Sequence, residues 1–322
     1  MKSLFGTDGI RGEAGKFPLD APTATTIGSS LASYLRTASG QQASIIIGRD
    51  TRESGGWLEQ ALINGASAAG AKCLSAGVIP TPGVAFLTRD LKADAGVVIS
   101  ASHNPYHDNG IKIFSPSGQK IADTVERKIE ADIYSPDSPT EKVAGDPPNA
   151  DAEEQLRKRY LRFLSEEIGK GLNLEGLTVV LDCANGASSH LAPQLFETLG
   201  AKVIAINVNP DGRNINLNCG SLHIESLQEK VIQERADLGV AFDGDADRSL
   251  FVDQKGNFVD GDATLWVLAN HFLNKGALKE NAVVATVMSN IGLEIALRSR
   301  GVELVRTDVG DKYVLEGLLK RD

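Results

Sequence analysis

The sequence is poor in cysteine and has no long hydrophobic run. Its three cysteines, Cys73, Cys183 and Cys219, are too few and too scattered for a disulfide framework or a zinc site, so we expect them to be reduced. No apolar run approaches the ~20 residues of a membrane span, and the N-terminus lacks the apolar core of a signal peptide. We therefore expect a cytoplasmic protein that does not act at a membrane.

Positive charge is also in deficit. The chain has 33 Lys and Arg against 42 Asp and Glu, a net charge of −9, which argues against nucleic acid or anionic membranes as partners. Any anionic ligand must therefore be met by a local basic pocket. A hydrophobic content of 42% with 23% charged residues is ordinary for a globular protein with a sizeable core.

One strand–helix–strand pattern recurs three times along the chain. Apolar stretches of strand length occupy residues 44–47, 177–181 and 282–287. Each precedes a helical pattern that closes at a glycine, and these glycines are Gly70, Gly200 and Gly301. A second short apolar strand follows each helix, which favours parallel βαβ units. We expect an α/β protein of three similar domains with mixed, mainly parallel sheets.

Composition also places the domain boundaries. A polar stretch with four prolines between residues 135 and 151 predicts a linker, and a charged helix over 152–168 follows it. The expected domains are residues 1–150, 151–257 and 258–322.

Two apolar strands break abruptly into polar residues. The first leads into Ser102, and the second leads into Asp243, Asp245, Asp247 and Arg248. In open α/β sheets ligands bind beyond the carboxyl ends of strands, so both polar tips are candidate site residues.

The three aspartates alternate with small residues. In an extended segment they would all face one way, and hard oxygen ligands in this number suit Mg2+ or Ca2+ rather than zinc. An EF-hand would need Gly and Glu where this sequence has Arg248 and Gln254, so that alternative fails. An acidic turn without a functional role is disfavoured, because three acids and an arginine directly follow a buried strand.

Two further cations are candidates for the same site. Asn109-Gly110 predicts a hairpin turn, after which residues 111–114 return as a strand with Lys112 facing the site. Arg11 lies in a glycine-rich opening that could aim it at a phosphate. The alternatives are a solvated lysine and a flexible terminus.

Ser102 suits one mechanism better than the others. Its neighbour His103 is poorly placed to act as an oriented general base, so a Ser-His-Asp mechanism is disfavoured. A phosphoserine would instead donate its phosphoryl group. Mg2+ would bind the three aspartates and a phosphate oxygen on Ser102, while Arg248 and Arg11 would neutralise charge.

These motifs resemble the α-D-phosphohexomutase family. The resemblance rests on Thr-Asp-Gly-Ile-Arg-Gly near the N-terminus, Ser-Ala-Ser-His-Asn-Pro around Ser102 and Asp-Gly-Asp-Ala-Asp-Arg at 243–248. Residues 5–12 and 309–314 are most similar to the branch that acts on glucosamine phosphate.

The resemblance implies an isomerase that interconverts glucosamine 6-phosphate and glucosamine 1-phosphate through a phosphorylated Ser102 and a bisphosphate intermediate. That reaction would feed UDP-N-acetylglucosamine and cell-wall synthesis. The resemblance also implies one Mg2+, priming of Ser102 by a hexosamine 1,6-bisphosphate or by autophosphorylation, and help from His103 and Lys112 at the serine. Gly310, Asp311 and Lys312 would contact the sugar. The expected partner is a small phosphosugar, and a homodimer is left open.

The resemblance also exposes missing motifs. The family's loop that binds the sugar hydroxyls and its Arg-x-Ser-Gly-Thr phosphate cradle do not occur before Asp322. The resemblance therefore implies a C-terminally truncated chain whose third domain is incomplete. Residues 52–56 mimic the cradle but lack its threonine. The alternatives are a phosphoglucomutase or phosphomannomutase, a metal-dependent phosphatase, and a non-catalytic fragment that binds phosphosugar.

Overall fold

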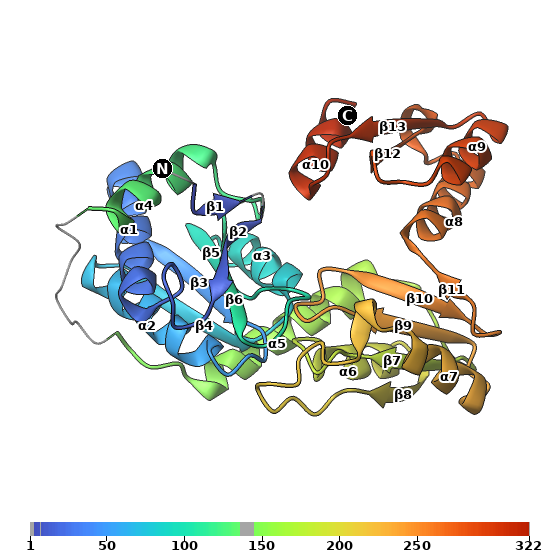
Figure 1. The fold of residues 1–322 in the computed structure, drawn as a ribbon, viewed down its shortest axis with the longest axis horizontal. Helices are drawn as coiled ribbons and strands as arrows, with labels where there is room; N and C mark the ends of the chain where they lie inside the picture. Colours follow the sequence, from blue (N-terminus) through green and yellow to red (C-terminus); the bar gives the residue numbers. More distant parts are fainter. Residues whose placement is uncertain (1–2, 7, 136–144, 322) are drawn as a thin grey trace.

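The computed structural model describes residues 3–6, 8–135 and 145–321, which form three α/β units (Figure 1). The proline-rich linker predicted between residues 135 and 151 falls largely on residues 136–144, which lie outside the described residues. In the described part of the chain, no helix is both long and apolar enough to cross a membrane.

The first unit is built on a six-stranded mixed sheet. Its strand order is β1-β2-β6-β5-β3-β4, in which β5, β3 and β4 are parallel and the other pairs are antiparallel. The strands are β1 (Phe5–Gly6), β2 (Gly9–Glu13), β3 (Ser44–Arg49), β4 (Lys72–Val78), β5 (Ala95–Ile99) and β6 (Asp108–Phe114). Alternate side chains of β3 and β5 enter different cores, because successive residues of a strand point to opposite faces.

Helices cover both faces of this sheet. On one face lie α1 (Ala21–Ser39), α2 (Gly55–Ala68) and α4 (Asp123–Ile133), and on the other α3 (Thr81–Asp90) and α5 (Ala150–Arg162). Although α5 is rich in charge, Leu156 and Tyr160 lie one turn apart on a single stripe and are buried in the core beside α3. A π-helical stretch, Phe163–Ile168, continues α5, so the long charged helix predicted over 152–168 is confirmed.

The second unit repeats this plan with five strands in the order β11-β10-β9-β7-β8. The strands are β7 (Thr178–Asp182), β8 (Lys202–Ile206), β9 (Leu238–Phe242), β10 (Ser249–Asp253) and β11 (Phe258–Val259). Helix α6 (Leu191–Thr198) packs on one face and α7 (Glu225–Glu234) on the other. The predicted hairpin after the acidic motif is confirmed, because β10 pairs antiparallel with both β9 and β11.

The third unit has a parallel two-stranded sheet, β12 (Ala282–Thr286) and β13 (Glu303–Thr307). Helices α8 (Gly261–Asn274) and α9 (Ile291–Ser299) pack on it around Leu293 and Leu297. Helix α10 (Asp311–Leu319) also contacts both strands, and it points toward the first unit (Figure 1). Short 3-10 turns occupy Gly220–Leu222 and Lys279–Asn281.

The repeat predicted from the sequence is confirmed in all three units. The pairs β3/β4, β7/β8 and β12/β13 are parallel, and a helix connects the strands of each pair. Gly70, Gly200 and Gly301 have φ values of 85°, 97° and 71°, the left-handed conformation that glycine adopts most readily at the end of a helix.

The turn predicted at Asn109-Gly110 is wrong, although the strand does fold back on β5 as expected. Both residues lie inside β6, where Gly110 pairs with Arg11 of β2. A Cβ on Gly110 would lie 2.5 Å from the Ser100 carbonyl oxygen, so this glycine permits close packing rather than a turn. The Asn109 side chain is buried and donates a hydrogen bond to Ser54 Oγ.

Candidate active site

Ser102 lies in the loop that joins β5 to β6, residues 100–107, which we call the serine loop. Its side chain is buried, and its backbone has φ +52°, a left-handed conformation that is uncommon for a residue with a side chain. The Ser102 N–H donates to Ser100 Oγ at 2.9 Å, which helps to hold this conformation. The serine therefore sits at the carboxyl end of a central strand, as the sequence predicts.

The acidic motif forms the loop between β9 and β10, residues 243–248, which we call the acidic loop. The extended segment predicted for it is wrong: the chain turns here, the Ala246 N–H donates to the Asp243 carbonyl, and Ala246 has φ +52°. The turn still brings the carboxylates of Asp243, Asp245 and Asp247 together, with their nearest oxygens all within 4.8 Å of one another.

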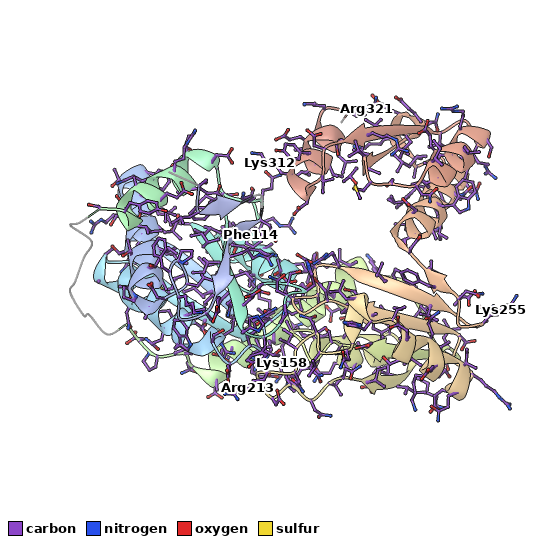
Figure 2. The ribbon with its side chains drawn as sticks, viewed as in Figure 1. Phe114, Lys158, Arg213, Lys255, Lys312 and Arg321 are labelled. Carbon is purple, nitrogen blue, oxygen red and sulfur yellow. The ribbon has the colours of Figure 1, made fainter. Side chains whose placement is uncertain are left out.

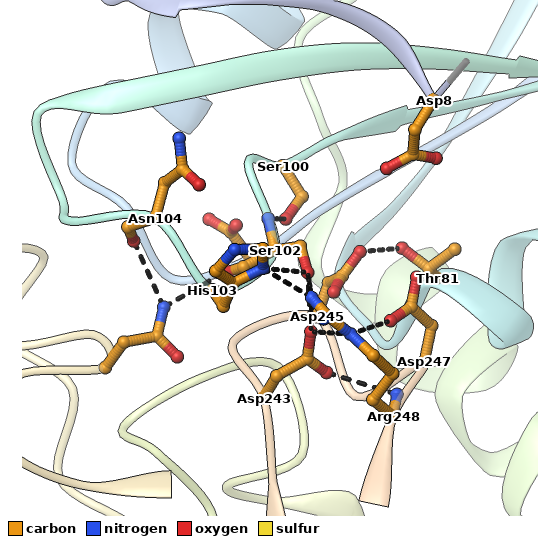
Figure 3. Close-up of polar contacts among 12 residues, drawn as sticks. Asp8, Thr81, Ser100, Ser102, His103, Asn104, Asp243, Asp245, Asp247 and Arg248 are labelled. Carbon is orange, nitrogen blue, oxygen red and sulfur yellow. Dashed lines mark hydrogen bonds and ion pairs between the residues drawn. The ribbon is translucent and has the colours of Figure 1, made fainter. Parts of the chain in front are cut away.

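The serine loop and the acidic loop meet across the boundary between the first and second units. Ser102 Oγ donates to Asp243 Oδ2 at 2.5 Å, and Arg248 Nη2 donates to Ser102 Oγ. Arg248 also forms an ion pair with Asp243 at 3.0 Å. Figure 3 shows these three side chains pointing toward one another. The hydroxyl thus contacts one acceptor and one cation.

Lys112 completes the cluster from β6 and faces the site as predicted. Its ammonium lies 3.0 Å from Asp245 Oδ2 and 3.2 Å from both Asp247 Oδ2 and Asp8 Oδ2. Burial opposes the charged form, but the three carboxylates outweigh it and raise the pKa of Lys112 above its usual range. Lys112 therefore stays protonated and acts as a fixed cation.

The surroundings of the three carboxylates shift their pKa values in different directions. Burial, together with the charges of Asp245 and Asp247, raises the pKa of Asp243 to about 6. Burial and the charge of Asp245 also raise the pKa of Asp247. Burial would raise the pKa of Asp245 as well, but Lys112 and the Thr81 hydroxyl outweigh it and hold this pKa below its usual value. Three crowded acids therefore favour a bound cation.

The donor set fits a hard divalent ion. Asp245 is almost fully buried, and its Oδ2 accepts hydrogen bonds from Thr81 Oγ1 at 2.6 Å and from Lys112 Nζ. Its Oδ1 is buried with no hydrogen-bond partner among the described residues. A buried carboxylate oxygen left without a donor is an unmet acceptor, and it lies beside two more carboxylates. All-oxygen coordination of this kind suits Mg2+.

His103 contacts the serine, and the charge of Arg11 acts on His103. Arg11 forms an ion pair with Asp8, and its charge helps to lower the pKa of His103. Burial is the largest cause of that lowered pKa, and Arg248 contributes as well, which keeps the imidazole neutral. His103 Nδ1 lies 3.5 Å from Ser102 Oγ and contacts Arg248 Nη2.

The residues predicted to contact the sugar lie at the start of α10. Gly310 precedes the helix, while Asp311 and Lys312 line a cavity of about 700 Å³ between the first and third units. Lys112 and Asp247 line the same cavity, which joins it to the cluster around Ser102. Lys312 reaches across to the first unit, where its Nζ lies 3.0 Å from Asp123 Oδ2 (Figure 2).

Four further residues of the cluster were not predicted from the sequence. Thr81, at the start of α3, donates a hydrogen bond to Asp245. Asp8, before β2, forms an ion pair with Lys112. Arg52 and Asn216 donate hydrogen bonds to the serine loop. Thr81 follows β4 at the same sheet edge as Ser102, so the strand-end rule could have found it.

The sequence is similar to proteins of known families. Models of phosphoglucomutase/phosphomannomutase α/β/α domains I, II and III match residues 2–140, 158–256 and 260–322. The chain is 49% identical to a phosphoglucosamine mutase of Citrifermentans bemidjiense and 50% identical to one of Solibacter usitatus. Each alignment covers 99% of this chain and 70% of the relative.

Solved structures show the same fold. A phosphoglucomutase/phosphomannomutase family protein from Burkholderia thailandensis is 26% identical, with a TM-score of 0.82 over 99% of this chain and 69% of that one. An N-acetylphosphoglucosamine mutase from Aspergillus fumigatus, solved in complex with GlcNAc-6P and magnesium, is 16% identical, with a TM-score of 0.60 over 99% of this chain and 65% of that one. The three domain matches and the two close relatives establish that the chain belongs to the phosphoglucomutase/phosphomannomutase family.

Proposed function

We propose that this chain interconverts glucosamine 6-phosphate and glucosamine 1-phosphate by phosphoryl transfer through Ser102, the reaction of a phosphoglucosamine mutase. Two relatives that are 49% and 50% identical over 99% of this chain are named phosphoglucosamine mutase. The observation that carries the proposal is the contact of Ser102 Oγ with both Asp243 and Arg248, beside a lysine and two more acids. This cluster suits a phosphoserine that transfers its phosphoryl group to a substrate.

The transfer exchanges one P–O bond for another. The bond from phosphorus to Ser102 Oγ breaks as a bond forms from phosphorus to the 1- or 6-hydroxyl oxygen of the sugar phosphate. The proton that the sugar hydroxyl loses is balanced by the proton that Ser102 Oγ gains. In the resulting state Ser102 Oγ–H donates to Asp243, which is the arrangement of the structure. After the bisphosphate reorients, its other phosphoryl group returns to Ser102 Oγ by the reverse exchange, which frees the isomeric sugar phosphate.

The cations of the cluster stabilise the transferring group. Arg248 Nη2 already donates to Ser102 Oγ, the leaving oxygen, so it can offset the negative charge that develops there. Lys112, held protonated by three carboxylates, faces the same cavity as the substrate would. His103 is neutral and can contact the phosphoryl group or take up a proton.

The acids and the serine would hold one Mg2+. Oxygens of Asp243, Asp245 and Asp247, with a phosphoryl oxygen on Ser102, would be its ligands. A bound Mg2+ would neutralise charge on the phosphoryl group. The unpartnered Asp245 Oδ1 is the oxygen that most needs such a cation.

The cavity between the first and third units is the proposed substrate site. It has room for a hexose phosphate and for the bisphosphate intermediate to reorient, with Lys112 at one side and Lys312 at the other. We propose that a hexosamine 1,6-bisphosphate or autophosphorylation primes Ser102, and that the enzyme works in the cytoplasm on a small phosphosugar.

Intact mass spectrometry tests the proposal. The purified chain is incubated with glucosamine 1,6-bisphosphate and Mg2+, with Ser102→Ala in parallel. One added phosphate on the wild type and none on the variant supports the proposal. No gain in mass on either protein would refute it. We call the phosphorylation of Ser102 by a bisphosphate charging. The charging rates with glucosamine, glucose and mannose 1,6-bisphosphate at equal concentration are then compared. A faster rate with the glucose or mannose compound would favour a phosphoglucomutase or phosphomannomutase.

A further inference from the structure

We infer that Asn216 is a positioning residue for phosphoryl transfer, which holds the serine loop against the acidic loop from the second unit. The inference rests on the proposed function, because it assigns Asn216 a role in the chemistry of Ser102. Asn216 lies in the polar segment that follows β8, far from Ser102 in sequence. Its side chain reaches the serine loop across the boundary between the two units.

Two carbonyl oxygens of the serine loop receive hydrogen bonds from both units. Asn216 Nδ2 donates to the Ser102 carbonyl at 2.9 Å and to the Asn104 carbonyl at 3.2 Å. From the first unit, Arg52 Nη2 donates to the same two oxygens at 3.1 Å and 2.5 Å. Both hydrogens of the Asn216 amide are thus engaged on the backbone that carries the nucleophile.

The serine loop needs such a restraint. Ser102 has a positive φ, and a residue with a side chain keeps that conformation only where its surroundings impose it. Fixing the carbonyl of Ser102 fixes the peptide plane that follows it and so restrains ψ of Ser102, which sets the direction of the Cα–Cβ bond. The donors therefore place Cβ, and the contacts of Oγ with Asp243 and Arg248 select the side-chain rotamer.

The acidic loop packs against the same contact. A Cβ on Gly244 would lie 2.6 Å from the Ser102 carbonyl oxygen and 2.8 Å from Asn216 Nδ2. Only a residue without a side chain lets the acidic loop approach this closely. Asn216, the serine loop and Gly244 thus form one contact, and Gly244 directly follows Asp243, the acceptor of the Ser102 hydroxyl.

The backbone of Asn216 is anchored independently of its side chain. Its N–H donates to the Ala184 carbonyl at 2.9 Å, and the preceding Ile215 is buried. Asn216 has φ +58°, which glycine adopts freely. Asn216→Gly therefore removes the amide donors and leaves the backbone course available.

Asn218 supplies a matched control. It lies in the same segment, has φ +51° and is exposed, and in the described part of the chain its side chain donates no hydrogen bond to the serine loop. Asn218→Gly makes the same chemical change at the same backbone conformation without touching the contact.

The experiment compares wild type, Asn216→Gly and Asn218→Gly in the full chain with Mg2+. The rate of Ser102 phosphorylation is measured by intact mass against the concentration of glucosamine 1,6-bisphosphate. We expect Asn216→Gly to lower the maximal rate at least ~10-fold, with the half-saturating concentration unchanged within about twofold, because misplacing a reacting group costs rate rather than binding. Asn218→Gly should match the wild type in both.

A second readout does not depend on activity. Hydrogen exchange of the amides of Ser102 and Asn104 should be roughly 5-fold faster or more in Asn216→Gly only, since one hydrogen bond contributes about 1 kcal/mol. Equal charging rates and equal exchange in all three proteins would overturn the inference. If the wild type gains no phosphate, the proposed function fails, and the exchange data still decide whether Asn216 holds the serine loop.

Discussion

Lys112 Nζ lies 3.0 Å from Asp245 Oδ2, and both side chains are almost fully buried. This ion pair joins β6 of the first unit to the acidic loop of the second. Two opposite buried charges hold each other in the ionised state, so removing one leaves the other uncompensated. The pair therefore fixes both the electrostatics of the site and the approach of the two units.

Replacing Lys112 tests this dual role. Lys112→Met keeps the length of the side chain and removes the charge, so three carboxylates lose their common cation. We expect at least ~100-fold slower charging of Ser102, because a fixed cation at the phosphoryl group stabilises the developing charge. Lys120→Met is the control, because Lys120 lines the same cavity but pairs with Glu126 instead. Equal loss in both variants would contradict a specific role for Lys112.

The raised pKa of Asp243 predicts how pH changes stability and metal binding. Its pKa rises from 3.8 to about 6 on folding, so the folded state binds more protons between these values. The contribution of Asp243 to stability is thus present below the lower value and is lost as pH rises through the higher one. Mg2+ needs the ionised carboxylate, so Mg2+ should raise the unfolding temperature more at about pH 7.5 than at about pH 5.

Thermal unfolding with and without Mg2+ at both pH values checks this expectation. Asp243→Asn cannot ionise at this position, so in this variant Mg2+ should raise the unfolding temperature less than in the wild type at about pH 7.5. An equal increment in the wild type at both pH values would show that Asp243 does not govern metal binding.

The hydroxyl of Thr81 orients an expected metal ligand. Thr81 Oγ1 donates to Asp245 Oδ2, which leaves Oδ1 free for the ion. Thr81→Val removes this donor at nearly constant volume, and we expect Mg2+ affinity to fall roughly 10-fold or more. Thr88→Val in the same helix removes a hydrogen bond to the Val84 carbonyl, away from the acids, so it should bind Mg2+ like the wild type in calorimetry. Unchanged affinity in Thr81→Val would refute the orienting role.

Lys312 and Asp123 form an exposed ion pair across the cavity, so the pair contributes little to stability. If Lys312 binds the substrate phosphate, Lys312→Ala should raise the half-saturating concentration of bisphosphate about 10-fold or more, since a charge-assisted contact is lost. Asp123→Asn removes the same ion pair but no positive charge that could bind a phosphate, so that concentration should stay within about twofold. Equal changes in both variants would assign Lys312 to holding the two units together.

Much of the site was predictable because strand ends carry local signals. Ser102 and the acidic loop follow buried apolar strands, and Lys112 alternates with two isoleucines, so its direction follows from the period of a strand. Each of these signals can be read from a residue and the strand beside it, without knowing which distant segments pack together.

The rest depended on contacts between segments that are distant in sequence. Asn216 and Ser102 are 114 residues apart, and only the packing of two units brings them together. At Asn109-Gly110 a strong local turn signal was overridden, because pairing with β2 keeps both residues in a strand. The turn of the acidic loop was also missed, since alternation alone does not distinguish a strand from a tight loop.

The most direct measurement follows the phosphate after it has reached Ser102. The chain is charged with labelled bisphosphate, freed of excess reagent and mixed with glucosamine 6-phosphate and Mg2+. The account predicts that the label leaves Ser102 and appears in glucosamine 1,6-bisphosphate, at a rate that depends on the sugar phosphate. Release of the label as inorganic phosphate, at a rate independent of the sugar phosphate, would contradict it and indicate a phosphatase.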